Sequence, residues 1–402
     1  MSTSVARSSP IYLDNAASTP IFDEVIREML PYFKEYYGNP SSLHRFGRMT
    51  MRAIESARAR VSSLIGCKQH EIIFTSGGTE ANNLAIKGIA ELVRNSNPKK
   101  NCVVTSAIEH ASVLQAFRDL EKKGFDVSYL PVTPEAQIET ASLKRTVLDD
   151  RTALVSIMFS NNEVGTIQPI REFATITHKK GGLFHTDAIQ AVGKFPIDVN
   201  DLGVDLLSAS AHKMNGPKGV GALYKREGLK LAPIIHGGGQ ESTLRSGTEN
   251  VHGIVGFGKA CEIAAKKLDT YETKIRALRD YLIDHVLNEI PNSRINCFTQ
   301  KRIANIAHFT FLGVNGEDLI TKLDELGIAA STGSACSLTH RRPSHVLKAM
   351  GFSFAELTGS LRLSIGILNT KEEIDRAVSI LSQAVEELRR LSPFELGVYE
   401  QN

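Results

Sequence analysis

Residues 205–224 read Asp-Leu-Leu-Ser-Ala-Ser-Ala-His-Lys-Met-Asn-Gly-Pro-Lys-Gly-Val-Gly-Ala-Leu-Tyr. This pattern predicts a short apolar strand, a polar turn that carries Lys213, a group of glycines and a second strand. A lysine held at the edge of a core is poorly hydrated, so its neutral, nucleophilic form becomes accessible. A Schiff base needs such an amine. The ordinary alternative is a strand-end lysine that extends to the surface, and the rest of the chain decides between the two.

The same alternation of strands and helices extends over residues 71–225. It favours an α/β fold with a mainly parallel sheet that is covered on both faces. After residue 256 a long amphipathic stretch, 257–289, leads into shorter strands and helices. We therefore expect a large domain over residues 20–262 and a smaller α+β domain over 1–19 and 263–402. The expected strands of the sheet are 71–75, 102–106, 127–130, 153–159, 183–186, 206–208 and 220–224, and the expected helices are 79–94, 112–123, 143–148 and 170–179.

Composition points to a soluble enzyme of the cytoplasm. The 402 residues include 47 Lys and Arg against 44 Asp and Glu, so no charge excess indicates a nucleic-acid or membrane partner. The longest apolar stretch is far too short to span a membrane, and residues 1–10 lack the apolar centre of a signal peptide. The five cysteines are odd in number and never spaced as CxxC, which argues against a disulfide framework or a metal site.

Polar residues follow five successive strands of the predicted sheet, at the point where each strand ends. Ligands of open parallel sheets bind beyond these carboxyl ends. Two glycines before a helix can cradle a phosphate, although plain helix capping is the more frequent explanation. Each of the other residues also has an ordinary structural explanation, but five such strand ends in a row favour a binding site. The residues are Gly78 and Thr79, His110, Asn161 and Asn162, Asp187 and Gln190, and Ser210, His212 and Lys213.

These side chains match the needs of pyridoxal 5'-phosphate (PLP). This cofactor requires a lysine for its aldehyde, a carboxylate for its ring nitrogen, and hydrogen-bond donors for its phosphate and phenolate oxygens. Lys213 and Asp187 supply the first two. The set resembles the fold-type I PLP enzymes, the class of aspartate aminotransferase.

A cysteine provides the second distinctive feature. Cys336 lies in Ser331-Thr332-Gly333-Ser334-Ala335-Cys336-Ser337, and His340-Arg341-Arg342 follow shortly after. Small residues around a cysteine often mark simple packing. Glycine, serine and arginine neighbours instead favour an accessible thiol near positive charge, where the thiolate is stabilised.

With this loop included, the chain closely resembles the cysteine desulfurases of the NifS/IscS type over nearly its whole length. The resemblance implies a fold-type I PLP enzyme with a seven-stranded sheet and a mobile cysteine loop at about 331–343. It rests on the segments 12–17, 38–42, 74–80, 161–165, 185–190, 210–213, 245–248 and 333–336.

The resemblance also implies roles at matching positions. Lys213 would bind the cofactor aldehyde and move protons, and His110 would stack on the ring and act as acid and base. Asp187 would pair with the ring nitrogen, and Gln190 would donate to the phenolate oxygen. The phosphate would be held by Gly78, Thr79, Ser210 and His212, together with Thr248 from the partner subunit of a homodimer.

For the substrate, the resemblance implies L-cysteine. Asn162 and Arg362 would bind its carboxylate, the arginine with a bidentate pair of hydrogen bonds. Cys336 would take the sulfur as a persulfide, leaving L-alanine, and pass it to an acceptor such as an iron–sulfur scaffold.

Two departures from the family pattern concern surfaces. Arg342 stands where many relatives carry an acidic residue before the proline of the cysteine loop, and Ser242-Thr243 replace a frequent Arg-Gly pair. Such changes affect docking more than chemistry, so the sulfur acceptor stays open. Also open are selenocysteine lyase activity, another fold-type I reaction such as transamination, and a sulfur-relay scaffold without catalysis. The intact Lys213 and Asp187 argue against the scaffold.

Overall fold

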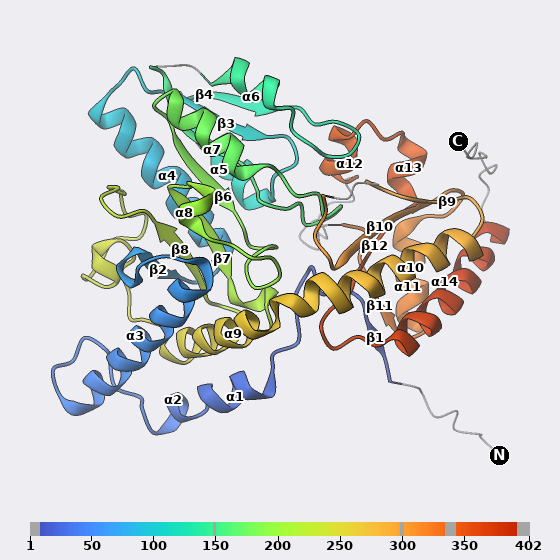
Figure 1. Ribbon diagram of the computed structural model, residues 1–402, viewed down its shortest axis with the longest axis horizontal. Coiled ribbons are helices and arrows are strands. Elements are labelled where there is room, and N and C mark those ends of the chain that lie inside the picture. Colours follow the sequence, from blue (N-terminus) through green and yellow to red (C-terminus); the bar gives the residue numbers. More distant parts are fainter. Residues whose placement is uncertain (1–8, 148–149, 298–300, 334–342, 392–402) are drawn as a thin grey trace. The chain divides into compact units, whose positions relative to one another are not determined.

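The computed structural model describes residues 9–147, 150–297, 301–333 and 343–391 (Figure 1). The chain divides into two compact units. The large unit comprises Ser18–Asn161 and Thr166–Asp269. The small unit comprises Met1–Ala17, Asn162–Gly165 and Thr270–Asn402. The short segment Asn162–Gly165 thus clusters with the small unit, although it lies inside the sequence range expected for the large domain.

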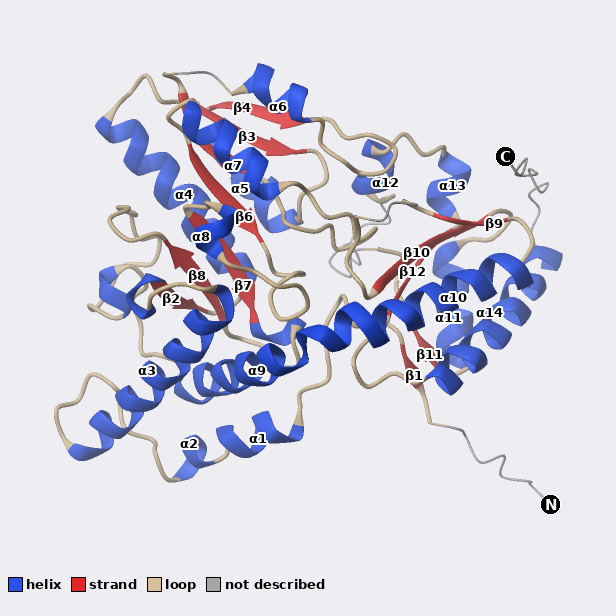
Figure 2. Cartoon of the chain, viewed as in Figure 1, coloured by secondary structure: helices blue, strands red, loops and turns tan. Residues whose placement is uncertain are grey.

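A seven-stranded sheet forms the centre of the large unit (Figure 2). Its order is β2-β8-β7-β6-β5-β3-β4. The pairs β3–β4, β3–β5, β5–β6 and β6–β7 are parallel, whereas β8 pairs antiparallel with β2 and β7. The expected fold class is therefore confirmed. The strands are β2 Ile72–Thr75, β3 Cys102–Ser106, β4 Asp126–Leu130, β5 Thr152–Ser156, β6 Leu183–Asp187, β7 Leu206–Ser210 and β8 Gly221–Lys225.

Helices cover both faces of this sheet because its strands are apolar on both sides. Leu206 packs in one hydrophobic cluster with residues of α4 and α5, and its neighbour Leu207 packs in the opposite cluster with residues of α3, α7 and α9. This alternation follows from the two-residue period of a strand. The helices are α1 Asp23–Met29, α2 Pro31–Lys34, α3 Arg45–Ile65, α4 Gly78–Ser96, α5 Ala111–Lys122, α6 Thr140–Thr146, α7 Ile170–Lys179, α8 Val199–Leu202 and α9 Val251–Thr270.

The small unit packs helices on two small sheets. One sheet has the antiparallel order β12-β10-β9, and the other pairs β1 with β11 in parallel, so that Ile11 lies opposite Ile328. The N-terminal segment is thereby built into this unit. Its elements are β1 Ile11–Tyr12, β9 Ser293–Ile295, β10 Ile306–Phe311, β11 Ile328–Ala329, β12 Ser360–Ser364, α10 Arg276–Glu289, α11 Gly316–Glu325, α12 His345–Ala349, α13 Phe354–Thr358 and α14 Lys371–Leu391.

The long amphipathic stretch is not one regular helix. A π-helical turn, Tyr271–Ile275, separates α9 from α10. Tyr271 and Ile275 are buried in the core of the small unit, so the extra residue of the wider turn is accommodated by packing. Periodicity in the sequence cannot reveal this turn, because one added residue changes the phase of the pattern only locally.

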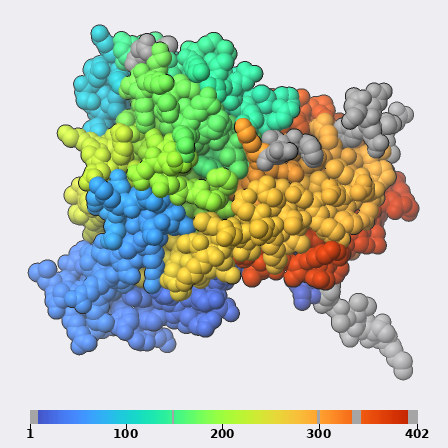
Figure 3. Space-filling model, viewed as in Figure 1, coloured from blue at the N-terminus to red at the C-terminus, as the bar shows by residue number. Residues whose placement is uncertain are grey.

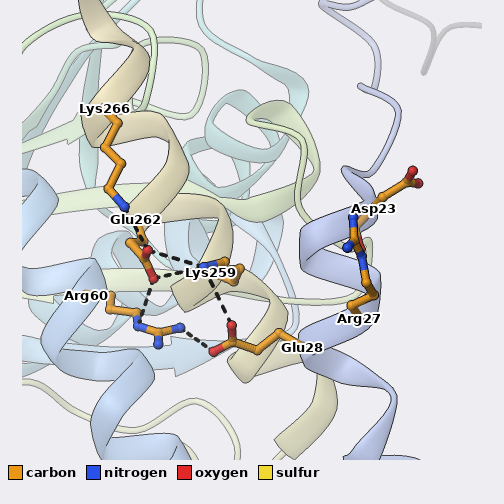
Figure 4. Close-up of polar contacts among 7 residues, drawn as sticks. All are labelled: Asp23, Arg27, Glu28, Arg60, Lys259, Glu262 and Lys266. Atoms are coloured by element: carbon orange, nitrogen blue, oxygen red, sulfur yellow. Dashed lines mark hydrogen bonds and ion pairs between the residues drawn. The ribbon is translucent and has the colours of Figure 1, made fainter.

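An ion-pair network joins three helices of the large unit (Figure 4). Arg60 of α3 pairs with Glu28 of α1 at 2.5 Å and with Glu262 of α9 at 3.5 Å, and Glu262 also pairs with Lys259 and Lys266 of its own helix. Exposed pairs contribute little singly, about 0.5 kcal/mol each, but a network fixes how charged helices lie on one another.

Within the described ranges, no helix combines the length and apolar character that a membrane span requires.

Candidate active site

Lys213 lies in a short turn directly after β7. Ser210, the last residue of the strand, is buried, and a 3-10 turn over Ala211–Lys213 follows it. The turn is closed by hydrogen bonds from Met214 N to Ala211 O at 3.0 Å and from Ala211 N to Val220 O at 3.2 Å. Lys213 itself is half-buried, as expected for an amine at the edge of a core.

Asp187 ends the neighbouring strand β6 and is 5% exposed. It lies opposite Ser208 of β7, so it shares the carboxyl edge of the sheet with the Lys213 turn. Its Oδ1 accepts from Ile189 N at 3.0 Å, and its Oδ2 accepts from Asn82 Nδ2 at 2.7 Å. Two donors on two oxygens hold this side chain as an oriented carboxylate.

The predicted phosphate cradle lies at the start of α4. A Cβ atom on Gly78 would come within 2.1 Å of Ile189 Cδ1 and 3.7 Å of Ser210 Cβ, so a side chain there would require Ile189 to move, and Ser210 lies beside it. Thr79 is exposed in the first turn of this helix, whose backbone N–H groups and dipole favour an anion. The structure thus brings Gly78 and Ser210 of the expected set together.

His212 extends the same region. Burial lowers the pKa of His212 to about 4, and the charges of Lys213, Lys218 and Lys194 act in the same direction. The ring is therefore neutral near pH 7 and carries a single N–H donor. Lysine charges around a neutral donor suit an anionic group such as a phosphate.

His110 caps the start of α5. Its Nδ1 accepts from Ser112 N at 3.1 Å and lies 2.8 Å from Ser112 Oγ. These contacts fix the orientation of a half-buried ring at the end of β3, where the sequence placed it.

Gln190 is buried and contacts Lys194, which is 1% exposed. Lys194 Nζ donates to Gln190 Oε1 at 3.3 Å. This contact fixes which end of the amide is the acceptor, and the Nε2 end carries the donors that a phenolate oxygen needs. No pattern in the sequence points to Lys194.

Arg362 and Asn162 come together in the small unit. The Arg362 guanidinium is 1% exposed, and its NH1 donates to Asn162 O at 2.7 Å. Its NH2 donates to Asp14 Oδ1 at 2.8 Å. His308 lies opposite Arg362 across β10 and β12, and burial, with the charge of Arg362, lowers the pKa of His308 to about 3. A buried cation is thus flanked by a carboxylate and a neutral ring.

Cys336 lies outside the described residues, as do His340, Arg341 and Arg342. The flanks of that segment both contact Glu163. A Cβ on Gly333 would come within 2.9 Å of Glu163 Oε2, and Ser344 Oγ donates to the same oxygen at 2.5 Å. Thr248, expected to serve the partner subunit, is exposed on the large unit.

A layer of uncharged polar groups lies in the sheet near Asp187. The His185 ring bridges Ser156 Oγ at 2.8 Å and Ser208 Oγ at 3.0 Å, across β5, β6 and β7. Burial lowers the pKa of His185 to about 3. Sequence reasoning missed this residue, since a histidine inside a strand carries no signal of its partners. It also missed Asn82, Ser112, Glu109 and Asp14.

Comparison with known proteins agrees with this arrangement. Residues 11–377 match the family model "Aminotransferase class-V". The chain is 47% identical to the cysteine desulfurase IscS of Dictyoglomus turgidum, over 96% of this chain and 97% of the relative. The chain belongs to the cysteine desulfurases of the class-V aminotransferase family.

Solved structures extend the match to the fold. A NifS-like protein superimposes with a TM-score of 0.88 at 39% identity, covering 94% of this chain and all of that protein. A structure described as SspA in complex with cysteine gives a TM-score of 0.78 at 36% identity, over 88% of this chain and 98% of that protein.

Cysteine desulfurases depend on PLP, and the described residues fit it. A fixed carboxylate, a strand-end lysine, an oriented amide and an anion cradle at the start of α4 are the donor set that this cofactor requires. These groups come from the ends of strands β2, β6 and β7 and their following turns.

Proposed function

We propose that this cysteine desulfurase transfers the sulfur of L-cysteine to Cys336 and releases L-alanine. The observation that carries the proposal is the strand-end pair of β6 and β7. There, a carboxylate fixed by Asn82 and Ile189 shares one sheet edge with the Lys213 turn. This pairing supports covalent binding of PLP at Lys213 with a charged partner for its ring nitrogen.

The bound cofactor withdraws electrons from the substrate α-carbon. Lys213 and His110 hold and move protons, because one is a half-buried amine and the other an imidazole with an oriented ring. Gln190 would donate to the phenolate oxygen, and Gly78, Thr79, Ser210 and His212 would hold the phosphate.

In the small unit, Arg362 and Asn162 bind the substrate carboxylate. Two partners already orient the guanidinium, and its five N–H donors allow further bonds to a carboxylate. Sulfur transfer then forms a bond between Cys336 Sγ and the substrate sulfur while the substrate C–S bond breaks. The proton count is conserved, since two thiols become one persulfide and the carbon gains a hydrogen, so no external oxidant is needed.

The test compares Cys336→Ser with Cys261→Ser, a control at a fully buried cysteine. With ³⁵S-cysteine as substrate, Cys336→Ser should lose both alanine formation and protein-bound label while keeping the yellow colour of the bound cofactor. Retained alanine formation by Cys336→Ser from cysteine would contradict the proposal and favour another fold-type I reaction. Retained turnover with selenocysteine alone would identify a selenocysteine lyase activity.

We infer a homodimer in the cytoplasm as the working form. Exposed apolar side chains gather on residues 30–46, at the N-terminal end of the chain, in blue in Figure 3. Leu43 is 90% exposed and Tyr37 is 69% exposed, which favours burial in an interface. Thr248 would complete the phosphate site of the partner. Sedimentation should give a dimer, and Leu43→Asp should shift it toward monomer.

The acceptor of the persulfide is a protein, for iron–sulfur cluster assembly or another thiolation. The name IscS of the relative supports the first. Transfer of ³⁵S from loaded enzyme to purified candidate acceptors tests this step. No direct contact with nucleic acid is proposed.

A further inference from the structure

Asn82 is a fully buried asparagine between two residues of the active site. It lies in α4, and its Nδ2 donates both to Asp187 Oδ2 at 2.7 Å and to Ser112 Oγ at 2.9 Å. Its Oδ1 is buried without a hydrogen-bond partner among the described residues. An apolar side chain would fill this position without leaving a buried acceptor unsatisfied. The cost to stability suggests that the two donated bonds serve another purpose.

The Asp187 carboxylate determines which end of the Asn82 amide faces it. An ionised carboxylate accepts hydrogen bonds and cannot donate them. Asp187 therefore fixes the Asn82 amide with its NH₂ group toward the carboxylate, and the second hydrogen of that group points to Ser112 Oγ.

Ser112 passes this direction on to His110. Because Ser112 Oγ accepts from Asn82, its own hydrogen is available for His110 Nδ1 at 2.8 Å. Ser112 N donates to the same nitrogen at 3.1 Å. With two donors on Nδ1, the neutral ring carries its proton on Nε2, and Nε2 is the atom at which protons are exchanged.

We infer that Asn82 is a positioning residue that couples Asp187 to His110 through Ser112. Three hydrogen bonds connect Asp187, Asn82, Ser112 and His110 in that order. The orientation of the Asp187 carboxylate and the hydrogen bonding of the His110 ring therefore depend on each other. The four side chains come from β6, α4, α5 and the segment after β3. The inference rests on the proposed roles of Asp187 and His110.

The test replaces Asn82 by leucine, which keeps the volume and removes both donors. Asn83→Leu is the matched control, because Asn83 is the next residue of α4 and its Nδ2 contacts the backbone oxygen of Thr79 at 2.9 Å. Holoenzyme labelled with ¹⁵N-histidine contains 12 histidines, and His110→Asn identifies the signals of His110 by their absence. Among the described residues, the hydrogen bonds of Asn82 go to Asp187 and Ser112 and not to His110, so a change at His110 reports coupling through Ser112.

We expect wild-type His110 to show a protonated Nε2 and an accepting Nδ1. Asn82→Leu should shift the Nδ1 signal, because the Ser112 hydroxyl loses the donor that turns its hydrogen toward Nδ1 while Ser112 N still donates there, and Asn83→Leu should cause no shift. Unchanged His110 signals in Asn82→Leu would overturn the inference. These outcomes are independent of turnover, so they stand apart from the question of whether cysteine is the substrate.

Kinetic measurements on Ser112 variants give a second readout, which does not require Asn82→Leu to fold. Ser112→Ala interrupts the same chain and should lower kcat about tenfold with little change in KM, because it acts on proton transfer and not on substrate binding. Ser112→Thr retains a hydroxyl and should restore most of the rate. The double variant Ser112→Ala/Asn82→Leu should lose no more kcat than Asn82→Leu alone. If the two losses of kcat multiply instead, the residues do not act through one hydrogen-bond chain.

Discussion

The guanidinium of Arg362 and the carboxylate of Asp14 form an ion pair of 2.8 Å inside the small unit. The arginine side chain is 1% exposed and the aspartate side chain 18% exposed. Asp14 belongs to the N-terminal segment, which enters this unit beside β11 and β12. The pair therefore links the start of the chain to the residue proposed to bind the substrate carboxylate.

Asp14→Ala should destabilise the protein and weaken binding of cysteine. Removing one partner leaves a buried charge uncompensated, at a cost of about 3 kcal/mol. Chemical denaturation measures the first effect and the KM for cysteine the second. Asp23→Ala, in the first turn of α1, is the control at an exposed aspartate. Equal stability of Asp14→Ala and wild type would show that the pair has no such role.

Thr243→Gly should stabilise the protein. Glu241, Ser242 and Thr243 have φ values of 45°, 56° and 67°, a left-handed turn held by Arg58 and Phe74 N on the Glu241 carboxylate. A β-branched residue is strained there, so glycine should gain about 1 kcal/mol. Thr175→Gly, at an exposed position inside α7, should instead lose about 0.4 kcal/mol. Thermal unfolding measures both, and a loss in Thr243→Gly would contradict the strain.

Lys194→Met should weaken binding of PLP. Methionine keeps the length of the buried side chain but removes the donor that fixes Gln190. We expect the dissociation constant of PLP, measured from absorbance on titrating apoenzyme, to rise about tenfold. Lys180→Met, at the residue directly after α7, should leave it unchanged. If the dissociation constant of PLP is unchanged in Lys194→Met, Lys194 has no role in binding the cofactor.

Glu109→Gln should change how stability depends on pH. Burial raises the pKa of Glu109 to about 8; hydrogen bonds from Ser106 and Met158 N oppose the shift, and the charge of Asp187 adds to it. Between the unfolded value of about 4.5 and pH 8, the folded state holds a proton that the unfolded state releases. This group therefore makes the free energy of unfolding fall as pH rises through that window.

The glutamine variant removes this dependence and keeps the Oε1 acceptor for both donors. It should be more stable than wild type at pH 8, with a difference that shrinks toward pH 5. Urea denaturation at several pH values measures the slope, and exposed Glu121→Gln is the control. Parallel curves for Glu109→Gln and wild type would refute the assignment.

The fold was largely predictable from the sequence, because short runs rich in β-branched and apolar residues alternate with helical stretches. The predicted strand 102–106 and helix 170–179 match β3 and α7 to the residue. Predicted strand 153–159 runs too far, since β5 ends at Ser156 and the chain leaves the sheet through Ile157 and Met158, which are still buried. Residues that are buried but not paired in a sheet have the same apolar pattern as a strand, so the sequence cannot separate the two.

The site was predictable only where chemistry marks a residue. Lys213 and Asp187 stand at strand ends, and such positions can be read from the sequence. Asn82 and Lys194 lie inside apolar helical or turn segments, where a polar residue looks like an ordinary surface position. Asn82 matters because it contacts Asp187, which lies more than a hundred residues away in the sequence, and Lys194 matters because it is buried. A local sequence pattern reveals neither a distant partner nor burial.

The serine–histidine–serine layer formed by Ser156, His185 and Ser208 has an electrical consequence. His185 and Asp187 are two residues apart in β6, so they project to the same face of the sheet. Since the His185 ring stays uncharged down to about pH 3, the layer supplies dipoles to this face and no cation. The layer therefore places no positive charge beside Asp187 in the sheet, and the carboxylate can pair with a protonated ring nitrogen at the strand ends.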